Sequence, residues 1–190
     1  DNLQRVDIDP EELEPFIPNQ ATKDLRKLQE QVESCIQLME EAKRPVVILG
    51  WGIRLAKAEQ EAIKLVNSLG FPVLPTWATM DMLPSGHPLV VGSFGLHSTR
   101  YGNFAVQNSD LVLSIGSRLD THLTGSPLTT FAREAKKIVV DIDIRELNKY
   151  GTYGMNMDVP IHADAKDFLQ VINSKIDGMT RPDIAGWKRR

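Results

Sequence analysis

The residues with the clearest chemical potential in this sequence stand directly after its short apolar runs. Glycines follow the runs at 46–49 and 110–115, and aspartates end the run at 138–142. Glycine lets a backbone approach a ligand closely, and a helix that starts behind it offers N–H groups to a phosphate. A carboxylate can accept hydrogen bonds from ribose hydroxyls. The set consists of Gly50, Trp51, Gly52, Thr76, Trp77, Gly116, Ser117, Arg118, Asp141, Ile142 and Asp143. Together these residues predict a nucleotide-binding edge.

Each of these residues also has a structural alternative. Glycine ends buried strands in α/β proteins whatever their ligand. Asp143 can instead cap a helix that starts at Ile144. Aromatic side chains near the loops, among them Trp51 and Trp77, can cover a ring or seal the edge of the sheet, and we favour sealing. The clustering therefore carries more weight than any single member.

Several familiar catalytic signatures are missing from the sequence. The segment 50–55 begins like a dinucleotide fingerprint but has Leu55 where the third glycine belongs, and none of the 13 glycines is followed by lysine, so a P-loop is excluded. No Gly-x-Ser-x-Gly elbow occurs. The four histidines fall in four separate segments without the spacing of metal ligands. No general acid and base pair emerges.

Composition narrows the class of protein further. The chain has 22 Lys plus Arg against 25 Asp plus Glu, a net charge of −3 that gives no reason to bind nucleic acid. Its one cysteine, Cys35, cannot form an internal disulfide or a Cys-rich zinc site and is expected to serve packing. No apolar run approaches the roughly 20 residues that span a bilayer, and the N-terminus is acidic. We expect a soluble, cytoplasmic protein.

Hydrophobic periodicity places these residues on a regular alternation of elements. Apolar residues at three- and four-residue spacing predict helices, and continuous β-branched runs predict strands that are covered on both faces. The predicted helices are 21–43, 56–69, 98–107 and 164–172, and the predicted strands are 46–49, 71–74, 110–116, 138–142 and 159–162. Residues 76–91, rich in proline, are expected to form loop and short helical turns. The fold class is α/β: a doubly wound, mostly parallel, Rossmann-like sheet of five to six strands with helices on both faces.

The length of 190 residues suits one sizeable core. Residues 1–18 hold six acids, one base and three prolines and are typical of an arm or linker. We therefore expect three parts: an arm at 1–18, a folded domain at 19–174 and a tail at 175–190.

At the level of motifs, the sequence resembles the central domain of thiamine-diphosphate-dependent enzymes and, within them, the acetolactate synthase group. The resemblance covers Ala21 to Ile172, and its motifs occur in the family order. They are RPVVILGWG (44–52), FPV (71–73), GLHST (95–99), NSDLVLSIGSRLD (108–120), LTG (123–125), VDID (140–143) with Glu146 and Lys149 behind it, and PIHADA (160–165).

The resemblance implies a larger enzyme with three domains. The arm at 1–18 would be the linker from an N-terminal pyrimidine-binding domain, and the tail at 175–190 the linker toward a C-terminal pyrophosphate-binding domain. Those two domains would hold thiamine diphosphate, Mg²⁺ and the catalytic glutamate, so the fragment itself would be inactive. The parent would decarboxylate a 2-keto acid, transfer the acyl unit and assemble as a homo-oligomer, with no nucleic acid or membrane partner.

The resemblance also implies a ligand in the central domain, because relatives carry FAD, ADP or nothing there. By position, the cofactor-binding candidates are Gly50, Trp51, Gly52, Thr76, Trp77, Gly95, Leu96, His97, Gly116, Arg118, Asp120, Asp141, Ile142, Asp143 and Asp164. Three departures from the family pattern count against FAD: Trp51 within a Gly-Gly-Gly loop, His122 in place of a phosphate-binding arginine, and Ala163 in place of a glycine.

Two other hypotheses stay open. The chain could be a freestanding module that binds NAD or an adenine nucleotide, although a sirtuin is excluded because its zinc site needs four cysteines. The domain could also bind nothing and act as a structural spacer between its neighbours.

Overall fold

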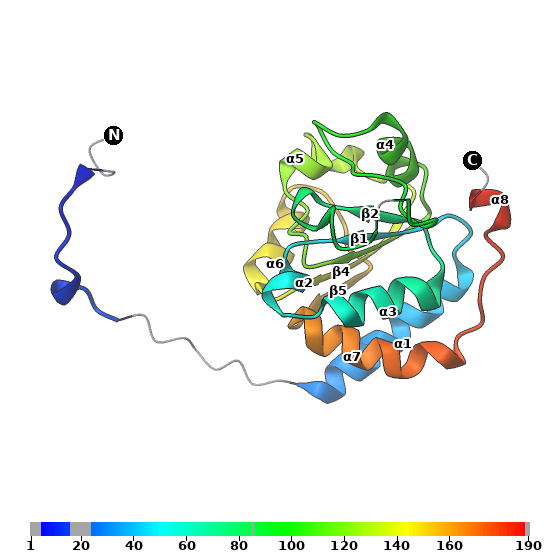
Figure 1. Ribbon diagram of the computed structural model, residues 1–190, viewed down its shortest axis with the longest axis horizontal. Helices are drawn as coiled ribbons and strands as arrows, with labels where there is room; N and C mark the ends of the chain where they lie inside the picture. Colours follow the sequence, from blue (N-terminus) through cyan, green and yellow to red (C-terminus); the bar gives the residue numbers. More distant parts are fainter. Residues whose placement is uncertain (1–4, 16–23, 85, 189–190) are drawn as a thin grey trace.

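Five parallel strands form a central sheet in the spatial order β2-β1-β3-β4-β5 (Figure 1). The computed structural model describes residues 5–15, 24–84 and 86–188. The strands are β1 (Pro45–Leu49), β2 (Val73–Pro75), β3 (Leu111–Ile115), β4 (Lys136–Asp141) and β5 (Val159–His162). In the register, Ile48 of β1 lies opposite Leu74 of β2 on one side and Ser114 of β3 on the other. The predicted parallel sheet is therefore confirmed, with five strands in the described part of the chain.

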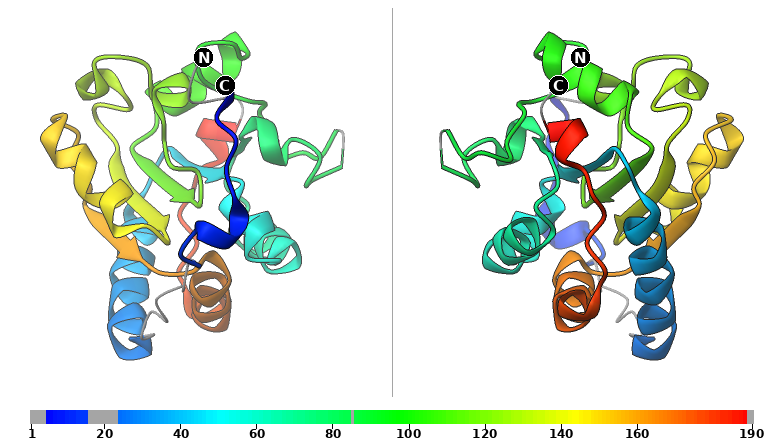
Figure 2. Two further views of the ribbon diagram at one scale, coloured as in Figure 1. Left: turned by 90° about the vertical axis from the view of Figure 1, so that its left-hand side faces the viewer. Right: turned by 90° about the vertical axis from the view of Figure 1, so that its right-hand side faces the viewer.

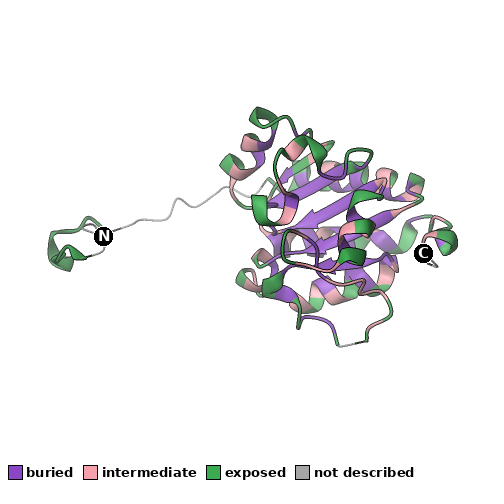
Figure 3. Cartoon of the chain, turned by 90° about the horizontal axis from the view of Figure 1, so that it is seen from above, coloured by how far each residue is buried: buried purple, intermediate pink, exposed green. Residues whose placement is uncertain are grey.

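Both faces of this sheet are buried, which explains why its strands have continuous apolar runs. Successive side chains of a strand point to opposite faces. Val47 and Leu49 accordingly belong to one hydrophobic cluster, and Val46 and Ile48 to a second cluster on the other side. Figure 3 shows the strands as a buried layer between helices whose outer surfaces are exposed.

Helices cover the two faces of the sheet in separate layers (Figure 2). One face packs against α1 (Leu25–Glu41), α3 (Glu59–Leu69) and α7 (Ala165–Lys175). The other packs against α4 (Arg100–Gln107) and α6 (Ile144–Thr152). The shorter elements are η2 (Pro10–Glu12), α2 (Gly52–Leu55), η3 (Trp77–Thr79), α5 (Thr121–Thr124), η4 (Leu128–Thr130), η5 (Ile176–Gly178) and α8 (Ala185–Lys188). The doubly wound class predicted from the sequence is confirmed.

Two helical predictions need correction. The helix predicted at 56–69 begins at Glu59, because Lys57 adopts a left-handed φ of 52° and separates it from α2. Helix α6 was not among the predicted helices, because only Leu147 and Tyr150 of its residues are buried and its apolar pattern is short. Its first turn confirms the alternative for Asp143, whose Oδ1 accepts the Arg145 N–H at 2.9 Å.

The segments before α1 and after α7 differ in burial: the first is exposed, and the second packs partly against the core. Residues 5–15 are exposed throughout and contain only the short turn η2, while the predicted domain boundary at residue 19 lies outside the described residues. After α7, the chain buries Met179 and Ile184, and the indole N–H of Trp187 donates to the Pro45 carbonyl at 3.0 Å. No helix in the described residues is long and apolar enough to cross a bilayer. The two linkers remain predictions.

Candidate functional site

A pocket of about 650 Å³ lies at the carboxyl edge of the sheet. Its walls come from the segments that follow all five strands, and it includes the point between β1 and β3 where the chain changes winding direction. Ligands of open parallel sheets bind at such a point. A volume of this size is in the range of small-molecule sites. The edge predicted from the sequence is therefore a real concavity in the structure.

Most of the candidate residues line this pocket. Those that do are Trp51, Gly52, Thr76, Trp77, Gly116, Arg118, Asp120, Asp141, Ile142, Asp143 and Asp164. Four candidates do not: Gly50, Gly95, Leu96 and His97. His97 still lies close to the site, because its ring centroid is 6.1 Å from that of Trp77.

Positions 50, 52 and 116 require glycine because the backbone segments that follow β1 and β3 cross each other at these residues. A Cβ atom on Gly50 would lie 2.2 Å from the Gly116 carbonyl oxygen, and one on Gly52 would lie 2.8 Å from the Gly116 Cα. Gly116 itself has a left-handed φ of 60°. Gly95 is similar, since its Cβ would lie 2.4 Å from the His122 carbonyl oxygen. These glycines serve close approach between backbones.

The same crossing uses the N–H groups that a phosphate would need. Gly50 donates to the Ile115 carbonyl at 2.9 Å, Gly52 to the Gly116 carbonyl at 2.9 Å, and Ile53 to the Gly50 carbonyl at 3.2 Å. A phosphate cradle at the start of a helix depends on uncommitted N–H groups. The N–H groups of Gly50, Gly52 and Ile53 are therefore already committed to carbonyl oxygens.

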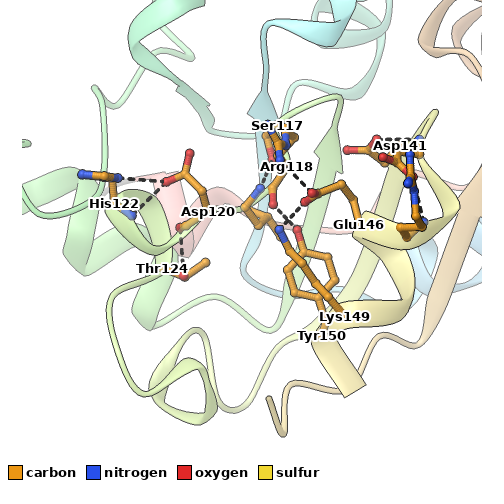
Figure 4. Close-up of polar contacts among 12 residues, drawn as sticks. Ser117, Arg118, Asp120, His122, Thr124, Asp141, Glu146, Lys149 and Tyr150 are labelled. Carbon is orange, nitrogen blue, oxygen red and sulfur yellow. Dashed lines mark hydrogen bonds and ion pairs between the residues drawn. The ribbon is translucent and has the colours of Figure 1, made fainter. Parts of the chain in front are cut away.

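Arg118 is held by contacts at both its backbone and its side chain (Figure 4). Its φ of 58° is left-handed, and the Tyr150 hydroxyl donates to its carbonyl oxygen. Its Nη2 lies 2.7 Å from Glu146 Oε1, while Lys149 Nζ contacts the other Glu146 oxygen. The hydrogen bond to Glu146 raises the pKa of Arg118, and the bond from Arg118 is the largest cause that lowers the pKa of Glu146. Both groups are therefore charged and paired at neutral pH.

Carboxylates dominate the lining of the pocket. Asp120, Asp141, Asp143, Glu146 and Asp164 face it, against Arg118 as the single guanidinium among the described lining residues. Asp141 is almost fully buried, and burial is the main cause that raises its pKa, with Glu146 and Asp143 adding repulsion. Burial therefore disfavours the charged form of Asp141, whereas hydrogen bonds favour the charged forms of Asp143 and Glu146.

Three of these acids also begin helices. Asp120 accepts the His122 N–H at 2.8 Å at the start of α5, and Asp164 accepts the Lys166 N–H at 2.8 Å at the start of α7. Asp143 caps α6 in the same way, and the backbone hydrogen bond from Arg145 is the main cause that lowers its pKa. A capping carboxylate has lone pairs left to accept a ligand hydroxyl. The capping role and a binding role are compatible.

Large apolar side chains form the exposed rim of the pocket. Trp51, Trp77 and Ile142 line it with 48%, 58% and 67% of their surface exposed. Arg54 lies over the Trp51 ring at 5.8 Å. Exposed apolar side chains gathered around a concavity are typical of binding sites. They offer flat surfaces against which a ring could stack.

The sequence reasoning gave Glu146 no role in the site. Glu146 stands three residues after the helix cap Asp143, a spacing typical of the first turn of a helix, and this pattern could have placed it beside Arg118. The described residues contain no group of three or more His, Cys, Asp or Glu side chains arranged to hold a metal ion.

Comparison with known families follows this geometry. The family described as "Thiamine pyrophosphate enzyme, central domain" matches residues 32–172. The matched region contains the whole sheet and every residue that lines the strand-end pocket.

Individual relatives agree with the family match. The chain is 37% identical to a probable acetolactate synthase large subunit of Methanococcus aeolicus over 153 residues, covering 80% of this chain and 25% of the relative. It is 36% identical to the acetolactate synthase large subunit of Corynebacterium glutamicum over 159 residues, 83% of this chain and 25% of the relative. The chain is 34% identical to acetolactate synthase 2, chloroplastic, of Nicotiana tabacum over 161 residues, which cover 83% of this chain and 23% of the relative. The chain thus spans about a quarter of the length of these relatives.

Proposed function

The chain belongs to the family of thiamine pyrophosphate enzyme central domains, and from this premise we propose that it is the middle domain of an acetolactate synthase-type enzyme. The observation that carries the proposal is the match over residues 32–172, together with relatives that are acetolactate synthase large subunits. The parent would decarboxylate a 2-keto acid and transfer the acyl unit. Thiamine diphosphate would supply the decarboxylation chemistry in the parent.

The contribution of this chain would be structural first. Its sheet is packed on both faces, so it has a core of its own and can hold neighbouring domains at fixed positions. Thiamine diphosphate, Mg²⁺ and the catalytic residues would be held by other domains, and the parent would act as a cytoplasmic homo-oligomer. The chain alone would be inactive.

We propose in addition that the strand-end pocket receives an adenosine group, which FAD and ADP both contain. The pocket suits the ring and the ribose of such a ligand better than it suits the diphosphate. Trp51 and Trp77 suit a flat ring, and Asp141, Asp143 and Asp164 suit ribose hydroxyls. Fewer donors are free for the diphosphate, because the N–H groups of Gly50, Gly52 and Ile53 already donate to carbonyl oxygens and Arg118 already contacts Glu146.

The test of the proposed function is turnover by a longer protein that contains these 190 residues between flanking domains. We expect CO₂ release from pyruvate or another 2-keto acid only when thiamine diphosphate and Mg²⁺ are present, and none from the 190-residue chain under the same conditions. Absence of release from every 2-keto acid in a panel would refute the assignment.

A freestanding NAD-binding module remains the alternative function. Calorimetric titration with NAD, FAD and ADP separates the two: tight binding of NAD with no response to FAD or ADP would favour the module.

A further inference from the structure

A second concavity, of about 810 Å³, lies at the edge of the sheet where the strands begin. Residues that stand just before four of the strands line it: Arg44 before β1, Pro72 before β2, Ser109 before β3 and Arg133 before β4. Because the strands are parallel, these residues share the edge opposite to the strand-end pocket. We call this concavity the strand-start groove.

Exposed apolar side chains line part of the strand-start groove. Tyr101 and Phe104, both on α4, line it with 60% and 56% of their surface exposed. The half-buried Leu89 and Val91 extend this apolar surface. Apolar side chains that gather around a concavity are typical of interaction sites. The groove can therefore bury apolar side chains of a partner.

The charges of the strand-start groove are mainly positive. Arg44, Arg133 and Lys188 line it, against Glu134 as the one carboxylate among the described lining residues. Arg133 and Lys188 are exposed, and neither forms an ion pair with another residue in the described part of the chain. Arg44 donates its Nε–H to the Asn108 carbonyl at 2.7 Å, which is a neutral partner. An acidic partner would therefore meet cations that no carboxylate neutralises.

The arm of this chain has the complementary composition. In residues 5–15, five acids outnumber one base, and three large apolar side chains are 57%, 61% and 59% exposed. The apolar residues are Val6, Ile8 and Leu13, and the acids are Asp7, Asp9, Glu11, Glu12 and Glu14. Every one of these residues is exposed. The arm thus offers the acidic and apolar groups that the strand-start groove could cover.

The position of the arm favours the groove of a second copy. Figure 1 shows the arm and α8 on opposite sides of the domain, and α8 carries Lys188 of the groove. The arm therefore lies far from the groove of its own chain. The strand-end pocket is a poorer acceptor for an acidic segment, because five carboxylates line it.

We infer that the arm of one copy docks in the strand-start groove of a second copy. The acidic side chains of the arm contact Arg133 and Lys188, and its apolar side chains pack on Tyr101 and Phe104. A reciprocal exchange of arms closes a dimer, as in other proteins whose protomers exchange an identical element. This contact uses neither the strand-end pocket nor a flanking domain, so it goes beyond the proposed function.

The first test is analytical ultracentrifugation of the 190-residue chain from micromolar to millimolar concentration. We expect a monomer–dimer equilibrium whose dissociation constant is at least about tenfold larger at about 150 mM salt than at about 10 mM, because the screening length shortens from about 30 Å to about 8 Å. A chain that stays monomeric at low salt, or a dimer that does not respond to salt, would overturn the proposal.

Charge reversal of the arm tests one partner. The arm variant carries Asp7→Lys, Glu11→Lys, Glu12→Lys and Glu14→Lys, which reverse the sign of its net charge. Asp9 is kept because it accepts the Glu11 N–H at 2.9 Å and caps η2. Since the variant arm and the native groove are both positive, dimerisation should weaken at least about tenfold at low salt.

Charge reversal of the groove tests the other partner. Arg133→Glu with Lys188→Glu makes the groove negative, so this groove variant should also dimerise at least about tenfold more weakly. Arg26→Glu with Lys64→Glu, at exposed positions of α1 and α3 outside the groove, is the charge-matched control and should leave dimerisation unchanged.

An equimolar mixture of the arm variant and the groove variant is the decisive experiment. Each arm then meets a groove of opposite charge on the other variant, so dimerisation should return, which also shows that both variants fold. Unchanged dimerisation of either variant alone, or no dimer in the mixture, would overturn the proposal. Neither outcome bears on turnover by the longer protein, so the proposed function is tested separately.

Discussion

At the scale of single residues, Gly50 is fixed by the backbone of a neighbouring strand end. A methyl group there would overlap the Gly116 carbonyl and the Ser117 Cα, which lie 2.2 Å and 2.3 Å from the Cβ position. We expect Gly50→Ala to lower the free energy of unfolding by about 2–3 kcal/mol, because backbone rather than a flexible side chain must move. Chemical denaturation measures this loss.

Gly151 provides the control for that measurement. It lies in α6 with nothing within 4 Å of its Cβ position, so alanine there should leave stability unchanged or raise it by about 0.5–1 kcal/mol. Equal stability of the two alanine variants would contradict the crossing described above.

The stability contributions of Asp141, the last residue of β4, and Asp143, two residues later, should respond to pH in opposite directions. Burial raises the pKa of Asp141, so its ionised form costs stability, and this cost is relieved as the pH falls through the raised pKa toward the ordinary value of 3.8. Asp141→Asn should therefore stabilise the protein at pH 7, with a gain that shrinks in acid. Thermal denaturation between pH 3 and pH 8 measures the gain.

Asp143 is the matched comparison for Asp141. The backbone hydrogen bond from Arg145 lowers its pKa, so its contribution is present above the unfolded pKa and is lost as the pH falls. Asp143→Asn, which keeps a capping side chain, should be destabilising at pH 7 and neutral in acid. The same sign for both variants would refute the assigned environments.

At the scale of elements, α6 holds the loop between β3 and α5 through Tyr150 and through Glu146, which pairs with Arg118. The buried Tyr150 hydroxyl donates to the carbonyl of Arg118, which has a left-handed backbone. Tyr150→Phe should cost about 1 kcal/mol, because the Arg118 carbonyl loses the donor that the buried Tyr150 supplies. Tyr153→Phe, at the exposed residue that directly follows the same helix, should cost nothing measurable in the same denaturation assay. A silent Tyr150→Phe would show that the loop does not depend on this hydrogen bond from α6.

The sequence predicted elements with continuous or periodic apolar residues better than elements that bury few residues. Runs such as that of β1 are apolar at every position because both faces of the sheet are covered, and this pattern is visible without a structure. α6 buries only Leu147 and Tyr150, which is too short a pattern to show a period. The break between α2 and α3 depends on the left-handed backbone of Lys57. A lysine in the sequence gives no signal for this conformation, because residues other than glycine adopt it rarely.

The sequence also predicted only part of the candidate site. Residues after the strands could be placed at one edge because parallel strands end together, and most of them do line one pocket. The ion pair between Arg118 and Glu146 could not be predicted from the sequence, because it depends on how α6 lies against the loop that follows β3. The use of the glycine N–H groups likewise depends on the crossing of two backbones.

At the scale of the whole molecule, the two ends of the sheet have different roles. The carboxyl edge carries the pocket, while Trp187 after α7 packs at the opposite edge against Pro45, where β1 begins. This arrangement places two tryptophans, Trp51 and Trp77, in the pocket and the third far along the strand direction. Tryptophan emission can therefore report on the pocket selectively.

The most direct test of a ligand-binding role, against a spacer that binds nothing, is a fluorescence titration of the Trp187→Phe variant with adenosine and, separately, with ADP. We predict a saturable change in emission with adenosine that becomes smaller in variants that also carry Trp51→Phe alone or Trp77→Phe alone. No change with either ligand at millimolar concentration would contradict the account and leave the domain a structural spacer.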